Sequence, residues 1–174
     1  MDYDDLIGFL KKHEGFKDTT YLDGNGIPTI GYGFTDSNLV KRGKISQKEA
    51  DKILLKRVKG DSQVLRQKLG PTVWDQLKDT SKTALLSYYY NYPAGFKDTT
   101  RFMAAWRKGN YKEAIRQVDA GMNDPNNPGL KTRRLEEQGR LLEDPLLTGD
   151  FNYRYPYTGP QFKPVDIVAN KINT

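Results

Sequence analysis

Residues 19–34 constrain the fold most, because they form the one convincing β region in a chain whose other apolar residues recur at helical spacing. Their sequence, TTYLDGNGIPTIGYGF, places aromatic and β-branched residues on both sides of the turn-forming DGNG, a pattern typical of a β-hairpin. Gly31 and Gly33 alternate with larger residues, so another part of the chain can approach this strand closely. The sequence therefore predicts an α+β fold that is predominantly helical.

Helical patterns precede and follow the hairpin. A first amphipathic helix is predicted to end just before Gly15, which places Glu14 at its C-terminal end. Residues 35–45 are predicted to form a loop, and an S-x-x-E capping box then opens a helix over residues 46–69. A helix of that length spans roughly 30 Å and can join two lobes. Further helices are predicted at a short segment holding Trp74 and Leu77, at the apolar and therefore buried residues 84–90, and at residues 100–106, 111–118 and 130–142.

These segments predict one domain over residues 1–145. Its β lobe covers about residues 14–45, the linking helix about 46–69, and the helical lobe about 70–145 together with the first helix. Residues 146–174 contain three prolines and little helical periodicity, so they are predicted to form an extended tail.

The amino-acid composition excludes several kinds of catalytic and metal-binding site. The chain has no cysteine, which excludes disulfides, cysteine nucleophiles and thiolate zinc sites. A single histidine, His13, argues against a histidine metal cluster or a Ser-His-Asp triad, so we expect neither a metal nor a cofactor. The net charge of +6 suits an anionic partner, such as nucleic acid, anionic lipid or the bacterial wall, but simple solubility is the alternative that the charge alone favours. No apolar run has the length of a membrane span, and the N-terminus lacks the pattern of a signal peptide.

Candidate catalytic groups gather around the predicted hairpin. Glu14 ends a helix, Asp23 lies in the glycine-rich turn and Thr29 enters a strand, so the three side chains can surround one cleft. Acid-assisted bond cleavage needs two carboxyls in different environments, one that keeps and donates a proton and one that stays ionised and activates water. The alternative is that both are solvated surface charges, because the chain has 22 acidic residues and most acidic residues are exposed.

The segment HEGFKDTTYLDGNGIPTIGYGF resembles the signature of the phage-type lysozymes, a family of muramidases. The matching residues, in order and at the family's spacing, are Glu14-Gly15, Tyr21, Asp23-Gly24 and Thr29-Ile30-Gly31-Tyr32-Gly33. Four later segments, ISQKEADKILLKRV, LLSYYYNYPAGF, RKGNYKEAI and GLKTRRLEE, resemble later helices of the family. The resemblance spans about residues 3–143 and leaves the tail uncovered.

The resemblance implies a phage-type lysozyme fold and a role for each candidate group. Glu14 would protonate the glycosidic oxygen, Asp23 would orient or deprotonate the attacking water, and Thr29 would help to hold that water. The bond would be the β-1,4 linkage between N-acetylmuramic acid and N-acetylglucosamine of peptidoglycan, cleaved with inversion. Inversion calls for carboxyl groups about 6.5–9.5 Å apart.

The resemblance also implies contacts to the sugar chain, at Thr35, Tyr90, Thr99 and Gln117. Core packing is the alternative for Tyr90 and simple solvation the alternative for Gln117. A basic residue among Lys131, Arg133 and Arg134 would lie near Glu14. The alternative is an exposed helix face on which these cations pair with Glu136 and Glu137.

The sequence departs from the family pattern at three places. Phe34 stands where the family often has histidine, and His13 stands where relatives can have a carboxylate. If either position supports the acid, the pH optimum would move. Tyr92-Pro93 replaces a glycine-containing turn, which changes the expected rim of the cleft near Asn91.

Three functions compete at this point. The first is an active muramidase that acts as a monomer on peptidoglycan glycan strands, with neither nucleic acid nor membrane insertion involved. The second is a non-catalytic wall-binding protein on the same scaffold. The third is nucleic-acid binding, which the interspersed acidic residues disfavour. With no recognisable signal peptide, we expect the protein in a host cytoplasm before release to the wall or periplasm, or injected or secreted by another route. Endolysin, virion lysozyme and secreted bacterial effector all fit.

Overall fold

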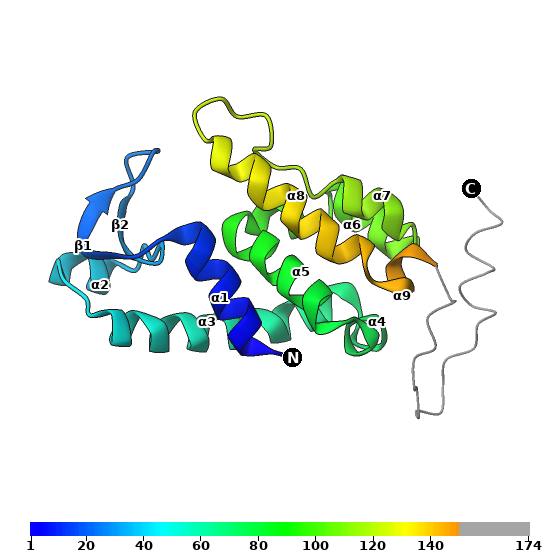
Figure 1. The fold of residues 1–174 in the computed structure, drawn as a ribbon, viewed down its shortest axis with the longest axis horizontal. Helices are drawn as coiled ribbons and strands as arrows, with labels where there is room; N and C mark the ends of the chain where they lie inside the picture. Colours follow the sequence, from blue (N-terminus) through cyan, green and yellow to red (C-terminus); the bar gives the residue numbers. More distant parts are fainter. Residues whose placement is uncertain (150–174) are drawn as a thin grey trace. The chain divides into compact units, whose positions relative to one another are not determined.

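The computed structural model describes residues 1–149 (Figure 1). Over this range the chain is mostly helical with one two-stranded sheet, which confirms the predicted fold class. It divides into two compact units, Met1–Gln63 and a second that begins at Val64. In chain order the elements are α1 (Tyr3–Glu14), β1 (Lys17–Leu22), β2 (Pro28–Gly31), α2 (Ser37–Arg42), α3 (Gln47–Leu69), α4 (Pro71–Gln76), α5 (Asp79–Asn91), the 3-10 helix η1 (Pro93–Phe96), α6 (Arg101–Arg107), α7 (Tyr111–Arg116), α8 (Pro128–Leu142) and α9 (Pro145–Thr148).

Helix α1 begins and ends as the sequence predicts. The Asp2 side chain caps it by accepting hydrogen bonds from the next turn, and its inner face is buried in the first unit. Gly15 ends the helix at a φ of +66°, with its N–H bonded to the carbonyl of Lys11. A positive φ favours glycine at this position. Glu14 is therefore the last residue of α1, as predicted.

Strands β1 and β2 pair antiparallel around the DGNG turn. Tyr21 lies opposite Thr29, and the register shifts between Tyr21 and Lys17, which lies opposite Gly31. Residues directly opposite each other in an antiparallel pair place their side chains on the same face. The side chains of Tyr21 and Thr29 are therefore neighbours.

Residues 35–45 are not a simple loop, so that prediction was wrong. Helix α2 lies within them, because the Asp36 side chain accepts from the N–H groups of Asn38 and Leu39, and Gly43 ends the helix at a φ of +75°. These are ordinary cap signals that the sequence contains. The segment after α2 then bonds to β1, with the N–H of Ile45 donating to the carbonyl of Asp18 at 2.8 Å.

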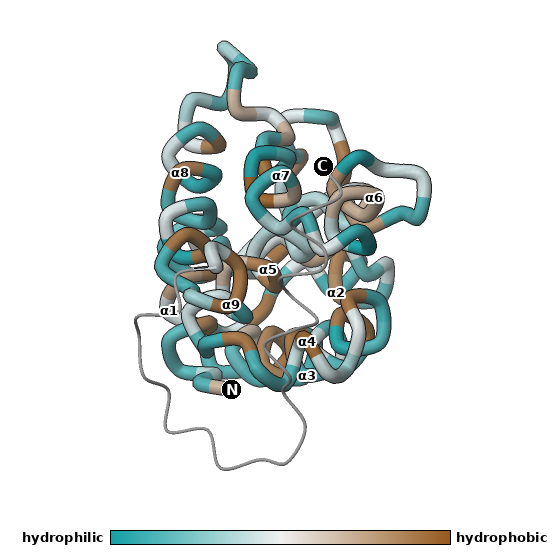
Figure 2. Tube along the Cα trace, turned by 90° about the vertical axis from the view of Figure 1, so that its right-hand side faces the viewer, coloured by the Kyte–Doolittle hydropathy of each residue, from teal (hydrophilic) through white to brown (hydrophobic). Residues whose placement is uncertain are grey.

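Helix α5 is the buried centre of the second unit. Residues 81–88 and Tyr90 are buried, which confirms the prediction for residues 84–90 except at Tyr89, which is half-buried. Helix α8 and η1 pack against α5, and α7 packs against α6; Figure 1 shows α8, in yellow, running beside α5. In Figure 2 hydrophobic and hydrophilic stretches alternate along α8, as they do in an amphipathic helix.

The long helix is continuous across Gly60, as α3 shows. The border between the two units falls inside α3. The first unit contains α1 together with the hairpin. The prediction from the sequence had placed the first helix with the helical lobe. Among the residues that the structure describes, no helix has the length and hydrophobicity of a membrane span.

The side chain of Asp144 accepts hydrogen bonds from the starts of both α9 and α5. Its Oδ1 accepts from the N–H of Leu146 and starts α9, so the tail predicted from residue 146 is helical in its first residues. Its Oδ2 accepts from the N–H of Lys78 and from the hydroxyl of Ser81, each at 2.8 Å, at the start of α5. The rest of the predicted tail, residues 150–174, lies outside the described residues.

Candidate active site

Glu14 is half-buried at the end of α1, and the backbone of Gly33 lies against it. A Cβ atom built on Gly33 would stand 3.4 Å from the Oε2 atom of Glu14, and Gly33 has a φ of +82°. The positive φ favours glycine at this position, and the distance of 3.4 Å is an ordinary van der Waals contact.

Asp23 is fixed by its own turn. Its Oδ1 accepts from the N–H groups of Asn25 and Ile27, each at 2.8 Å. Its Oδ2 accepts no hydrogen bond from any of residues 1–149. The carboxyl group therefore has a fixed orientation and one oxygen that can bind water.

Thr29 and Asp23 both donate a hydrogen bond to the carbonyl of Ile27. The carbonyl of Ile27 accepts from the Thr29 hydroxyl at 2.9 Å and from the N–H of Asp23 at 3.0 Å. Because the hydroxyl hydrogen is engaged, Thr29 can meet a further polar group only as an acceptor. The residue is 3% exposed, so little of its side chain is open to solvent.

Tyr21 is related to Glu14 and Asp23 by their charges and to Thr29 by strand pairing. Burial raises the pKa of the Tyr21 hydroxyl, and the nearby negative charges of Glu14 and Asp23 raise this pKa further. Both carboxylates therefore act electrostatically on the Tyr21 hydroxyl, and Tyr21 lies opposite Thr29 in the sheet. Sequence reasoning gave Tyr21 no role, although the hairpin register could have shown that it faces Thr29.

Phe34 and His13, the two departures from the family pattern in the first unit, have different surroundings. Phe34 is buried and packs on Gly31, where a Cβ atom would stand 2.8 Å from the Phe34 ring, and edge-on to Tyr32. The His13 ring packs against the ring of Phe9, 4.6 Å between centroids. Phe34 thus contributes to the core of the first unit.

The expected sugar contacts stay predictions. Thr35 is exposed in the first unit, just before α2. In the second unit Tyr90 is buried, Thr99 is exposed, and Gln117 is half-buried with its Nε2 donating to Glu113 at 2.6 Å. The burial of Tyr90 agrees with the core-packing alternative.

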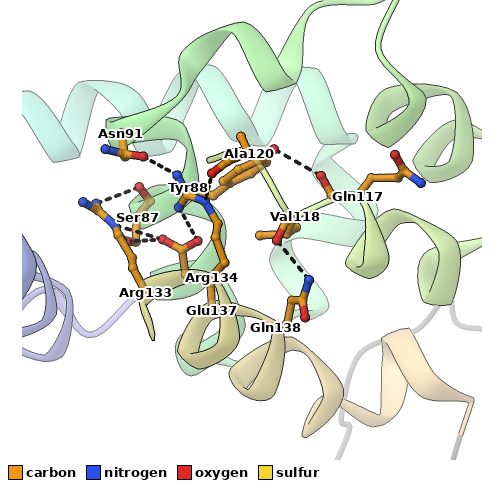
Figure 3. Close-up of polar contacts among 10 residues, drawn as sticks. All are labelled: Ser87, Tyr88, Asn91, Gln117, Val118, Ala120, Arg133, Arg134, Glu137 and Gln138. Carbon is orange, nitrogen blue, oxygen red and sulfur yellow. Dashed lines mark hydrogen bonds and ion pairs between the residues drawn. The ribbon is translucent and has the colours of Figure 1, made fainter. Parts of the chain in front are cut away.

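Arg133 and Arg134 do not lie on an exposed helix face, so that alternative is wrong for both. They are buried around Glu137, which is 0% exposed (Figure 3). Glu137 Oε1 accepts from Arg133 Nε at 3.1 Å and from the Ser87 hydroxyl at 2.6 Å, and Oε2 accepts from Arg134 Nη1 at 2.6 Å. Helical spacing brings the three charged residues to one side of α8, against α5. Lys131, in contrast, is exposed.

Arg134 extends this cluster to neighbouring segments. It donates to the carbonyl of Ala120 at 2.9 Å and to the side-chain oxygen of Asn91, and its guanidinium lies 4.7 Å from the ring centre of Tyr88. Burial raises the pKa of Tyr88 to about 12, against the opposing charge of Arg134, and its hydroxyl donates to the carbonyl of Gln117. The cluster thus ties α5 and α8 to the chain around residues 117–120.

We expect Glu137→Ala to lower the free energy of unfolding by about 3–5 kcal/mol, because it leaves two buried guanidinium groups without their carboxylate. Guanidinium chloride unfolding followed by circular dichroism measures this change. The control is Asp98→Asn, which breaks an exposed pair with Arg107 and should change the free energy of unfolding by about 1 kcal/mol or less. Similar effects of the two substitutions would contradict the role of Glu137.

Acid–base hydrolysis needs two carboxyl groups with different surroundings, and Glu14 and Asp23 have such surroundings at the end of α1 and in the hairpin turn. Among residues 1–149 no set of three or more acidic or histidine side chains could hold a metal ion. A sequence profile of the phage lysozyme family matches residues 11–137, and the chain belongs to this family. It is therefore a lysozyme, or muramidase, which hydrolyses peptidoglycan.

Solved structures agree with this assignment. An endolysin from Escherichia coli O157:H7 phage FAHEc1 is 26% identical, with a TM-score of 0.63, over 79% of this chain and 90% of its own. A mutant of P22 lysozyme is 26% identical, with a TM-score of 0.58, over 79% of this chain and 95% of its own. The endolysin Lyz of phage P1 is 18% identical, with a TM-score of 0.59, over 86% of each chain, which supports the fold alone. A comparison with curated protein sequences finds no match.

Proposed function

We propose that the chain cleaves the β-1,4 bond between N-acetylmuramic acid and N-acetylglucosamine with inversion at the anomeric carbon. Glu14 gives its proton to the glycosidic oxygen as the bond breaks, while water attacks the anomeric carbon from the opposite face and Asp23 takes up the proton of that water. The different surroundings of the two carboxyl groups support this division of roles, because Glu14 is half-buried beside the backbone of Gly33, whereas Asp23 Oδ1 accepts two backbone N–H groups of its turn.

The turn supports the roles of Asp23 and Thr29. The two backbone hydrogen bonds to Oδ1 fix the Asp23 carboxyl, and its Oδ2 can accept a hydrogen bond from the attacking water. Thr29 can accept a second hydrogen bond from the same water, because its own hydrogen points to Ile27. Two acceptors would aim the oxygen lone pair of the water at the sugar.

The partner in this proposal is the peptidoglycan glycan strand, which Thr35, Tyr90, Thr99 and Gln117 would contact. The chain would act as a monomer in the wall or periplasm, after release from a host cytoplasm or by injection or secretion. Moderate positive charge suits this setting, because bacterial walls are anionic.

Product analysis tests the bond and the mechanism together. Purified peptidoglycan is digested with the wild-type protein, and the new ends are reduced and identified. We expect muramic acid at the new reducing ends, and proton NMR in the first minutes should show the α anomer forming first. New glucosamine ends would contradict the proposed bond. Early accumulation of the β anomer would contradict inversion and the role of Asp23.

A further inference from the structure

Tyr32 fastens the end of the hairpin to α3. It lies between Gly31 and Gly33, and its side chain is buried in the first unit, with the residue 1% exposed. Its hydroxyl donates to Asp51 Oδ1 at 2.8 Å and accepts from Gln47 Nε2 at 3.3 Å. The turn that carries both glycines is therefore tied to the first two turns of α3.

The same oxygen of Asp51 is also tied to α1. Lys11 Nζ lies 2.8 Å from Asp51 Oδ1, and the hydrogen bond from Lys11 holds the pKa of Asp51 below its usual value. The hydrogen bond to Asp51 raises the pKa of Lys11 in turn, so the pair stays charged at neutral pH. Lys11 belongs to the last turn of α1, and Glu14 follows it by three residues.

These contacts close a ring around Glu14. From Glu14 the ring passes along α1 to Lys11, across to Asp51, across again to Tyr32, and along the backbone to Gly33, which lies against Glu14 Oε2. We name Lys11, Asp51 and Tyr32 the Tyr32 clamp. The Oδ1 atom of Asp51 thus joins α1, the turn of Gly31 and Gly33, and α3.

We infer that the Tyr32 clamp is a positioning device for Glu14, and this inference rests on the proposed role of Glu14 as the acid. The clamp fixes the last turn of α1 against Gly33, and so it fixes the direction in which the Glu14 carboxyl presents its proton. Proton transfer to a glycosidic oxygen depends steeply on that direction, because reacting atoms must approach within hydrogen-bond distance. The three residues of the clamp act through Glu14 and touch no reacting atom themselves.

Tyr32→Phe removes one oxygen atom and keeps the ring that packs against Phe16 and Phe34. We expect kcat on soluble glycan strands to fall about tenfold, since small misplacements of a catalytic group have large effects. KM should stay within roughly twofold of the wild-type value, because substrate contacts are unchanged. If the Tyr32 clamp only stabilised the fold, the Tyr32→Phe variant would have the wild-type kcat at temperatures where it is folded.

The matched control is Glu49→Gln, which breaks the Arg42 ion pair of 2.7 Å near the start of the same helix without reaching Tyr32. Its kcat should equal that of the wild type. If Tyr32→Phe is unfolded at the assay temperature, Asp51→Asn replaces it, because Asp51 is half-exposed and the amide keeps the size of the side chain. We expect about a threefold or greater fall in kcat for Asp51→Asn as well.

The outcomes separate this inference from the proposed function. A kcat within roughly twofold of wild type for a folded Tyr32→Phe or Asp51→Asn variant overturns the positioning role. In that case a Glu14→Gln variant without activity would still support Glu14 as the acid. An active Glu14→Gln variant would overturn the proposed function itself.

Discussion

We expect Glu14→Gln to lower the rate of peptidoglycan hydrolysis by about 10³-fold or more, while the protein stays folded. Glutamine is nearly isosteric with glutamate, so it fits beside Gly33 in the same space. Its amide cannot give a proton to the glycosidic oxygen, which then leaves as an unstabilised alkoxide. The change therefore removes the chemistry and leaves the packing at the end of α1.

Turbidity loss of purified peptidoglycan, with the release of new reducing ends, measures this effect. Glu49→Gln is the matched control, because it makes the same chemical change on another glutamate of the first unit. Wild-type lysis by the Glu14→Gln variant would show that another group supplies the proton. Loss of lysis in the Glu49→Gln control would show that the assay reports stability instead.

Asp23→Ala should lower the rate by about 10²-fold or more, because the attacking water loses both its base and its fixed orientation. The same change also removes the two hydrogen bonds that Oδ1 accepts from the turn. Initial rates of reducing-end release, with circular dichroism to confirm folding, measure the catalytic part.

Asp36→Ala is a control that distinguishes the loss of catalysis from the loss of the two backbone hydrogen bonds. Asp36 also accepts two backbone N–H groups through one oxygen, at the start of α2 in the same unit. Its loss should lower the free energy of unfolding by about 0.5–2 kcal/mol and leave the rate unchanged. Equal losses of rate in the two variants would mean that Asp23 has only a structural role.

Local signals in the sequence were enough to place the three catalytic candidates. A glycine that ends a helix, a DGNG turn and a β-branched strand each depend on neighbouring residues, so Glu14, Asp23 and Thr29 could be assigned to elements before the structure was seen. The close approach predicted at the glycines was also confirmed at Gly31, where a Cβ atom would stand 2.8 Å from the Phe34 ring. These features need no knowledge of the rest of the fold.

The surroundings of Glu137 could not be predicted in the same way. The spacing of Arg133, Arg134 and Glu137 predicts pairing along α8, and such pairing is usual on an exposed face. Only the packing of α8 on α5 shows that these charges are buried and that Ser87 completes the cluster. Burial of a charge depends on contacts between distant segments, and helical spacing does not report it.

The Tyr32 clamp escaped prediction for a similar reason. Lys11, Tyr32 and Asp51 are far apart in the sequence and belong to three elements. Each has an ordinary local role, as a helix cation, a strand aromatic and a helix carboxylate. Their meeting at one oxygen atom is a property of the folded first unit.

Asp144 limits how far a chain of this kind can be shortened without loss of contacts in the second unit. The family match ends at residue 137, yet this single carboxylate holds the beginnings of both α5 and α9. A chain cut at the end of the family match would leave the Ser81 hydroxyl and the Lys78 amide without their acceptor beside the central helix of the second unit. A shortened chain that keeps the packing of α5 therefore has to include Asp144 and the cap of α9 at Gly149.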